Sequence, residues 1–192
     1  MLIQIASTLG NALRSYAQFH PDQEALVSPG FRIRYREYEE RTNQFARYLS
    51  GQGVKKGDRV PLLTGTNASF ALSLMALAKI GAVAVPLNHY WKPEMIRWAI
   101  DDLEADFLLV GDQFYPLIQT EAETGKIRHT IVCEQNKVSP GLLRALQKYP
   151  DTSPVESVAL PLFWTGIHVI WWRLLPSTFQ RLHRSVYNPF WV

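Results

Sequence analysis

The sequence predicts an α/β fold, a mainly parallel sheet with helices on both faces. The prediction depends on residues 53–110, where short apolar runs of strand length alternate with longer segments of helical character and short turns join them. Strands that alternate with helices pair in parallel, because each helix carries the chain back to the edge at which the previous strand began.

The elements follow from periodicity and turn residues. Apolar positions at helical spacing predict an amphipathic helix over 4–18, and Pro29-Gly30 marks the turn of a hairpin between 25–27 and 32–34. A second helix is predicted over 35–50; its cap position holds Arg34, which has no side-chain acceptor, so we expect a weak first turn. Further elements are predicted at 59–64 (strand), 68–80 (helix), 82–85 (strand), 93–103 (helix), 107–110 (strand), 112–118 (helix, capped by Asp112), 130–133 (strand), 142–146 (helix) and 157–163 (strand).

Two residues carry predictions about the backbone. Pro61 lies in the first strand of the parallel sheet and has no N–H, so either that end of the strand is at an edge or pairing begins after it. Gly81 follows the helix at 68–80 and is expected to end it in the left-handed conformation. This helix is apolar nearly all round, which predicts burial.

Composition limits the class of protein. The chain of 192 residues is long enough to bury a core in one domain, and its net charge of +3 gives no argument for nucleic acid. The single cysteine, Cys133, excludes an internal disulfide and suits a reducing compartment, so we expect a cytoplasmic protein. The first 17 residues lack the basic start and apolar run of a secretory signal.

Three positions could have a functional role, but for each of them a structural role is the simpler explanation. His20 beside a turn could be a ligand or base, but such a histidine is usually structural. Thr66 or Asn67 could help a helix N-terminus hold phosphate, but capping the helix is the simpler role, since the loop lacks a lysine and a run of glycines. Lys79 could be catalytic, but a position near a helix C-terminus suits its charge.

Two further features are interpreted as structural. Asp101 and Asp102 are adjacent on a helix and point about 100° apart, so they cannot readily share a metal or substrate, and a solvated face is expected. Cys133 lies within a strand and is expected to be inert packing.

Several short motifs occur together in order. They are GVKKGDRV at 53–60, Asn67 leading a helix, KIGAVAVPLN at 79–88, PE at 93–94, and a strand after Ala105-Asp106. Together they resemble the N-terminal part of the adenylate-forming enzymes, the acyl-CoA synthetase and ligase superfamily, over residues 10–160. The resemblance implies a fold like the first N-terminal subdomain of those enzymes.

The resemblance also implies a reaction. Family members join a carboxylic or fatty acid to ATP, releasing pyrophosphate, and CoA then displaces AMP; full-length members use ATP, Mg²⁺ and CoA. The family's phosphate loop, a Ser/Thr- and Gly-rich run ending in Pro-Lys-Gly, should follow the strand at 157–163. This chain instead has FWTGIHVIWW at 163–172, in which only Thr165-Gly166 match. We therefore assign no catalytic, cofactor-binding or metal-binding residue.

The composition changes near residue 160. Acidic residues cease after Glu156, and four of the six tryptophans lie between 164 and 191. We divide the chain into a partial synthetase/ligase domain at 1–160 and an aberrant Trp/Arg-rich tail at 161–192. Three interpretations of the tail stay open: a frameshift or aberrant exon, a membrane-surface segment, and a spanning helix over 158–175. Pro161, Gly166, His168 and Arg173 argue against the last.

Two functional hypotheses follow. The first is a truncated AMP-forming acyl-CoA synthetase that is inactive alone. The alternative is a non-catalytic interaction module, associated with a membrane surface through its tail. We expect no nucleic-acid partner and find no specific protein partner; residues 161–192 could mediate self-association or membrane-surface contact. The encoding DNA separates the hypotheses, since a downstream frame restoring the phosphate loop would indicate truncation.

Overall fold

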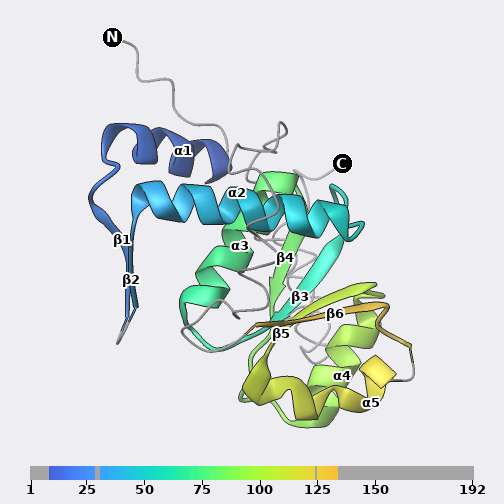
Figure 1. Cartoon of the computed structure of the whole chain (residues 1–192). Coiled ribbons are helices and arrows are strands. Elements are labelled where there is room, and N and C mark those ends of the chain that lie inside the picture. Colours follow the sequence, from blue (N-terminus) through green and yellow to red (C-terminus); the bar gives the residue numbers. More distant parts are fainter. Residues whose placement is uncertain (1–8, 29–30, 124, 134–192) are drawn as a thin grey trace, which may run out of the picture.

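A computed structural model describes residues 9–28, 31–123 and 125–133 of the chain. Helices and strands alternate through most of this range, as predicted (Figure 1). In order they are α1 (Leu9–Phe19), β1 (Glu24–Ser28), β2 (Phe31–Arg34), α2 (Tyr35–Gly51), β3 (Arg59–Leu63), α3 (Ala68–Ile80), β4 (Val83–Pro86), α4 (Pro93–Asp102), β5 (Phe107–Gly111), the 3-10 helix η1 (Asp112–Leu117), α5 (Gln119–Glu123) and β6 (His129–Cys133).

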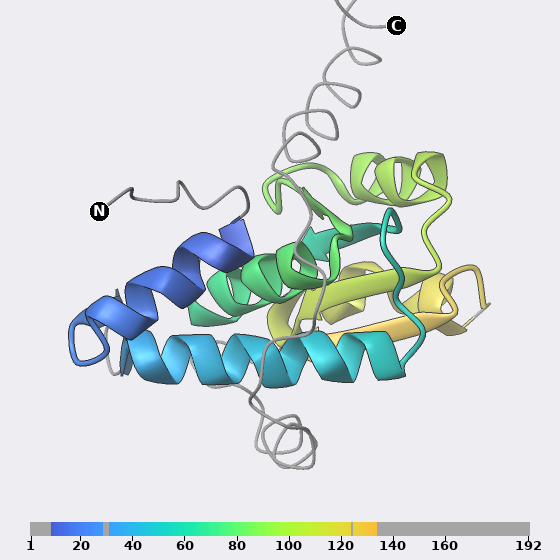
Figure 2. The same ribbon diagram turned by 90° about the horizontal axis from the view of Figure 1, so that it is seen from above.

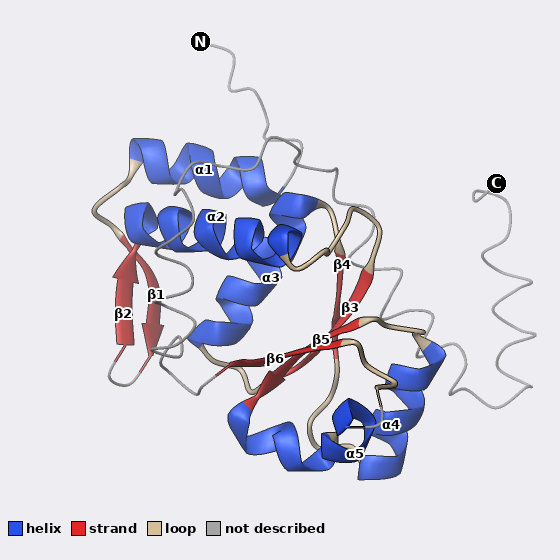
Figure 3. Ribbon diagram, turned by 45° about the vertical axis from the view of Figure 1, so that its right-hand side comes forward, coloured by secondary structure: helices blue, strands red, loops and turns tan. Residues whose placement is uncertain are grey.

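The central sheet is parallel throughout its described strands. Its strand order is β4-β3-β5-β6, and a separate antiparallel pair is formed by β1 and β2 (Figure 3). The chain passes from β3 to β4 on one side and then crosses to β5 on the other side of β3. The predicted α/β fold with a parallel sheet is therefore confirmed.

Pro61 lies in a central strand without interrupting it. The N–H groups of Val83 and Leu87 on the β4 side donate to the carbonyls of Asp58 and Leu62, at 2.8 and 2.9 Å. Alternate residues of a strand bond to opposite neighbours, so Pro61 turns its missing N–H toward β5. Pairing with β5 begins only at Leu62. The second of the two predicted explanations, pairing that begins after the proline, is correct.

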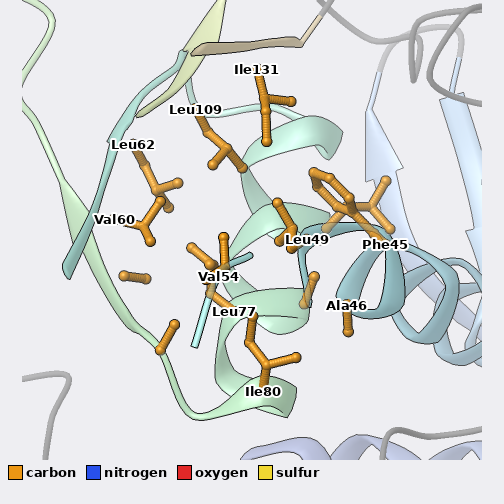
Figure 4. Packing of buried hydrophobic residues seen from close by; sticks show 14 of the residues in the cluster. Phe45, Ala46, Leu49, Val54, Val60, Leu62, Leu77, Ile80, Leu109 and Ile131 are labelled. Atoms are coloured by element: carbon orange, nitrogen blue, oxygen red, sulfur yellow. The ribbon is translucent and has the colours of Figure 1, made fainter. Parts of the chain in front are cut away.

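One face of the sheet is covered by α2 and α3. Strand side chains such as Val60, Leu62 and Leu109 meet Leu49 of α2 and Leu77 of α3 in a single apolar cluster (Figure 4). No residue of α3 is exposed, which confirms the burial predicted from its apolar circumference. The helix α1 packs on this layer through Leu13 and Ala17.

The opposite face is covered by α4, η1 and α5. Figure 2 shows α2 and α4 on opposite sides of the sheet. The strand residues that point to this side, including Leu63, Val85 and Leu108, pack with Ile96 of α4 and Ile118 after η1. Every residue of β5 is buried, because both faces of the central strands are covered.

The predicted helix ends are largely as expected. Gly81 ends α3 in the left-handed region with φ of 74°, and the Asn67 side chain caps its start. Arg34 precedes α2 without a side-chain cap bond. Pro93 occupies the first turn of α4.

The segment after β5 differs from the prediction. An α-helix capped by Asp112 was expected; instead Asp112 is the first residue of a 3-10 helix, and α5 follows separately. Pro116 explains the difference, because it lacks an N–H and its ring clashes with the carbonyl four residues earlier in an α-helix. The helix predicted at 142–146, the strand at 157–163 and the tail at 161–192 lie outside the described residues.

Along the described ranges, no helix combines the length and the apolar character needed to cross a bilayer.

Candidate functional site

The carboxyl ends of β3 and β5 mark the point where the chain changes direction across the sheet. The helix α3 follows β3 onto one face, whereas η1 follows β5 onto the other. In open α/β sheets, ligands bind outside such a switch point. Thr64 and Gly111 are neighbours there, since a Cβ on Gly111 would lie 3.7 Å from the Thr64 Cα. Among the described residues, the Thr64 hydroxyl is buried without a hydrogen-bond partner.

The loop from Thr64 to Asn67 has the chemistry of a helix cap. The N–H of Phe70 donates to Asn67 Oδ1 at 3.0 Å, which confirms the predicted capping role. A Cβ on Gly65 would lie 3.4 Å from the Gln113 side-chain nitrogen and 3.8 Å from that of Asn67, so the side-chain groups next to this glycine are two neutral amides. Such donors can orient an uncharged polar group, but they do not neutralise a triphosphate.

Aromatic rings occupy the same edge of the sheet after β4. The His89 ring lies 4.2 Å from the ring of Tyr90 and 5.0 Å from that of Phe114, centroid to centroid. Tyr90 is 86% exposed, and its N–H donates to Asn88 Oδ1 at 2.9 Å. The sequence indicated a loop at residues 87–91, but nothing in its spacing indicated contact with Phe114, which lies in η1 after β5.

A buried polar cluster joins α2 to α3. Lys79 Nζ donates to Glu39 Oε2 at 2.6 Å and also to Asn43 Oδ1. Asn43 Nδ2 donates to Glu39 Oε1 at 3.2 Å, which closes a triangle. The Lys79 side chain is 1% exposed and that of Glu39 is 13% exposed. Lys79 lies in the last turn of α3, as predicted, but its charge is also held by a carboxylate from another helix, which the sequence did not indicate.

Burial lowers the pKa of Lys79 below its usual range, while the hydrogen bond and charge of Glu39 act in the opposite direction. The Arg14 guanidinium on α1 lowers it further. Burial is thus the strongest of these influences, and it disfavours the charged form of the Lys79 ammonium. The cluster can hold helices in place, and its burial keeps it from any substrate.

Two other buried groups lie on the same face of the sheet. Burial raises the pKa of the Cys133 thiol to about 11, although a hydrogen bond with Ser73 acts in the opposite direction. The thiolate that reacts as a nucleophile is thus disfavoured, in agreement with the predicted inert role. Burial also raises the pKa of Tyr38, whose hydroxyl donates to the Ala71 carbonyl at 2.9 Å.

The remaining predicted residues have structural surroundings. The His20 ring lies 4.6 Å from that of Tyr16, as a packing role predicts. Asp101 is exposed and 3.3 Å from Lys126 Nζ, so it belongs to a solvated face. In the part of the chain that the structure describes, no three His, Cys, Asp or Glu side chains gather closely enough to hold a metal ion.

Comparison with known proteins identifies the family. The sequence profile of the AMP-binding enzyme family matches residues 13–165, which include the whole parallel sheet. The chain belongs to the AMP-binding enzyme family. The resemblance inferred from the motifs at 53–60 and 79–88 is thereby confirmed.

Relatives of this AMP-binding family member include acid–CoA ligases. It is 29% identical to a long-chain-fatty-acid–CoA ligase of Salmonella typhimurium over 114 residues, 59% of this chain and 20% of the ligase. It is 40% identical to a medium/long-chain-fatty-acid–CoA/3-oxocholest-4-en-26-oate–CoA ligase of Mycolicibacterium smegmatis over 116 residues, 59% of this chain and 21% of that protein. The matches thus extend over about a fifth of the length of these curated relatives.

The fold is also similar to that of a solved domain. The inhibitor-bound N-terminal domain of FACL13 from Mycobacterium tuberculosis superposes with a TM-score of 0.72 at 26% identity. The match covers 82% of this chain and 40% of that domain. The AMP-binding family member therefore has the architecture of part of such an N-terminal domain.

Proposed function

We propose that this chain is the first part of an ATP-dependent, AMP-forming acid–CoA ligase and that it does not form an acyl-adenylate by itself. In the complete reaction, a carboxylate attacks the α-phosphorus of ATP and releases pyrophosphate, and the thiol of CoA then displaces AMP. Fatty acids are the proposed acids, because the relatives named above are fatty-acid–CoA ligases.

The proposal that the chain does not form an acyl-adenylate by itself is supported by the lack of a charged phosphate-binding loop in the residues considered below. Phosphoryl and adenylyl chemistry requires donors that are already in place where negative charge develops. The described strand-to-helix loop at Thr64–Asn67 offers neutral amides, and the sequence at 163–172 has one glycine, Gly166, but lacks the lysine and the other glycines of the family's phosphate loop. The residues described do not fit ATP and Mg²⁺, so we derive no step through them.

The test is acid-dependent exchange of labelled pyrophosphate into ATP. Purified chain is assayed over short, long and aromatic acids, beside the full-length Salmonella typhimurium ligase as the positive control. We expect exchange from the ligase and none above background from the chain. Exchange by the chain that persists after a second purification step would overturn the proposal.

We propose a second function, a non-catalytic interaction module, on one observation. Residues 157–192 hold four tryptophans and no acidic residue, a composition that suits anionic lipid surfaces. Sedimentation with vesicles of phosphatidylcholine alone and of phosphatidylcholine with phosphatidylserine tests it. Selective binding to the anionic vesicles supports the module, and equal recovery in both supernatants rejects it.

For either function we propose a cytoplasmic location, since the chain holds one cysteine.

A further inference from the structure

The contact between α2 and α3 is fixed at two points by polar groups. At one point, Lys79 of α3 lies between Glu39 and Asn43, which are one turn apart on α2. At the other, the Tyr38 hydroxyl donates to the Ala71 carbonyl of α3. Ala71 and Lys79 are separated by about 12 Å along a helix axis. On α2 the two contacts begin at the adjacent residues Tyr38 and Glu39, so together they constrain where this part of α2 crosses α3 (Figure 1).

The buried stripe of α2 fixes the position of this helix along α3 less strictly than the polar contacts do. Its buried positions include Tyr38, Thr42, Phe45, Ala46 and Leu49, which form a stripe that repeats with each turn. A slide of one turn, about 5.4 Å, keeps buried positions facing the same neighbour, although it exchanges side chains of different size, such as Thr42 for Tyr38 and Leu49 for Phe45. A slide of that size would separate Glu39 from Lys79 and leave a buried ammonium without its countercharge, a strongly unfavourable state.

The energetics of the cluster argue against a purely stabilising role. Desolvation is the largest influence on the pKa of Lys79 and disfavours its charged form. Buried ion pairs are often replaced by apolar side chains without loss of stability, and a few of them are known to specify register instead. Besides Glu39 on α2, the charged group that acts on Lys79 is Arg14 on α1, which repels it.

We propose that the triangle of Glu39, Asn43 and Lys79 is an orientation lock, which selects one placement of α2 across α3 rather than adding stability. The proposal concerns the fold alone and does not depend on the function proposed above. Replacing only one of the three residues cannot test this role. Such a variant leaves a buried polar or charged group without its partner, and this is destabilising wherever α2 lies.

The experiment compares the full chain with the triple variant Glu39→Leu/Asn43→Leu/Lys79→Met. We expect the melting temperature of the triple variant to equal or exceed that of the natural chain. Amide hydrogen-exchange protection of α2 should nevertheless fall about tenfold or more while that of α4 is unchanged. Two-dimensional NMR should show multiple or broadened resonances confined to α2 and its neighbours on α1 and α3.

A charge-reversed variant, Glu39→Lys/Lys79→Glu, provides the rescue, since it restores an ion pair across the same contact. Its α2 resonances should be single if it folds. Glu37→Gln is the matched control, because it removes a partly exposed pair with Arg41 on the same helix. The lock is refuted if the triple variant keeps sharp, single α2 resonances. It is equally refuted if that variant melts at a clearly lower temperature or fails to fold, since the cluster would then be a stabilising element.

Discussion

The two faces of the parallel sheet are built differently. Toward α4 the fully buried side chains of the described residues are apolar, and the Nε atom of Arg97 is a buried polar atom on that helix. Toward α2 and α3 the apolar cluster is joined by buried polar residues: Thr42, Asn43, Ser69, Ser73 and Lys79. One sheet is therefore covered mainly by non-directional packing on one side and partly by directional contacts on the other. Hydrogen bonds and ion pairs depend on direction, whereas the hydrophobic effect does not.

Removing one partner of the charged cluster should have the largest effect. Glu39→Ala leaves the Lys79 ammonium buried beside Asn43 alone, and we expect a loss of about 3–5 kcal/mol in the free energy of unfolding. Urea unfolding followed by circular dichroism measures it. Asp101→Ala, which breaks the exposed pair with Lys126, is the control and should cost at most about 1 kcal/mol. Equal losses in the two variants would show that the Lys79 cluster is hydrated.

Truncation on the opposite face should cost somewhat less on average. Ile96 is fully buried on α4, and Ile96→Ala removes three carbon atoms from an apolar cluster, so we expect a loss of about 2–5 kcal/mol. Chemical denaturation at neutral pH provides the value. Trp98→Ala on the exposed side of the same helix is the control. If Ile96→Ala proved no worse than Trp98→Ala, α4 would not be firmly packed on the sheet.

The link between α3 and β4 should respond to backbone strain alone. Gly81 has φ of 74°, and Gly81→Val places a β-branched side chain in the left-handed region at a cost of about 1–3 kcal/mol. Thermal unfolding checks this, with Gly81→Asn as the milder substitution because asparagine tolerates that region. An unchanged midpoint for the valine variant would mean that residue 81 adopts an ordinary conformation.

The smallest expected effect is a dependence on pH at Cys133. The pKa of this thiol is raised to about 11 from the usual 9.0, so its contribution to stability is complete below pH 9 and is lost as the pH rises toward 11. The difference in unfolding free energy between the natural chain and Cys133→Ala should shrink by about 1 kcal/mol from pH 8 to pH 10. A difference that is constant over this range would place the thiol in contact with water.

The sequence was sufficient for most of the fold. The range of α3 and its end at Gly81 were predicted correctly, because an apolar segment between a capping Asn67 and a left-handed glycine carries its own start and stop signals. The strand order could not be read from periodicity, since it depends on which strands meet in space. Pro116 was the signal missed in η1, where the apolar spacing alone suggested an α-helix.

The polar cluster was beyond sequence reasoning for a different reason. Lys79 and Glu39 are 40 residues apart, and each has an ordinary local explanation: a cation near a helix C-terminus and an acid on a helix. Only the packing of α2 on α3 brings them together. The aromatic contact between His89 and Phe114 was missed similarly, since the loop after β4 and η1 after β5 follow strands that are not neighbours in the sheet.

We propose that this AMP-binding family member lacks a working nucleotide site. The most direct test is to measure the binding of labelled ATP in the presence of Mg²⁺. Equilibrium dialysis of the purified chain, with the Salmonella typhimurium ligase as the positive control, measures binding before any chemistry occurs. We predict saturable binding by the ligase and no saturable binding by the chain. Saturable binding of ATP to the chain, competed by unlabelled ATP, would contradict the account.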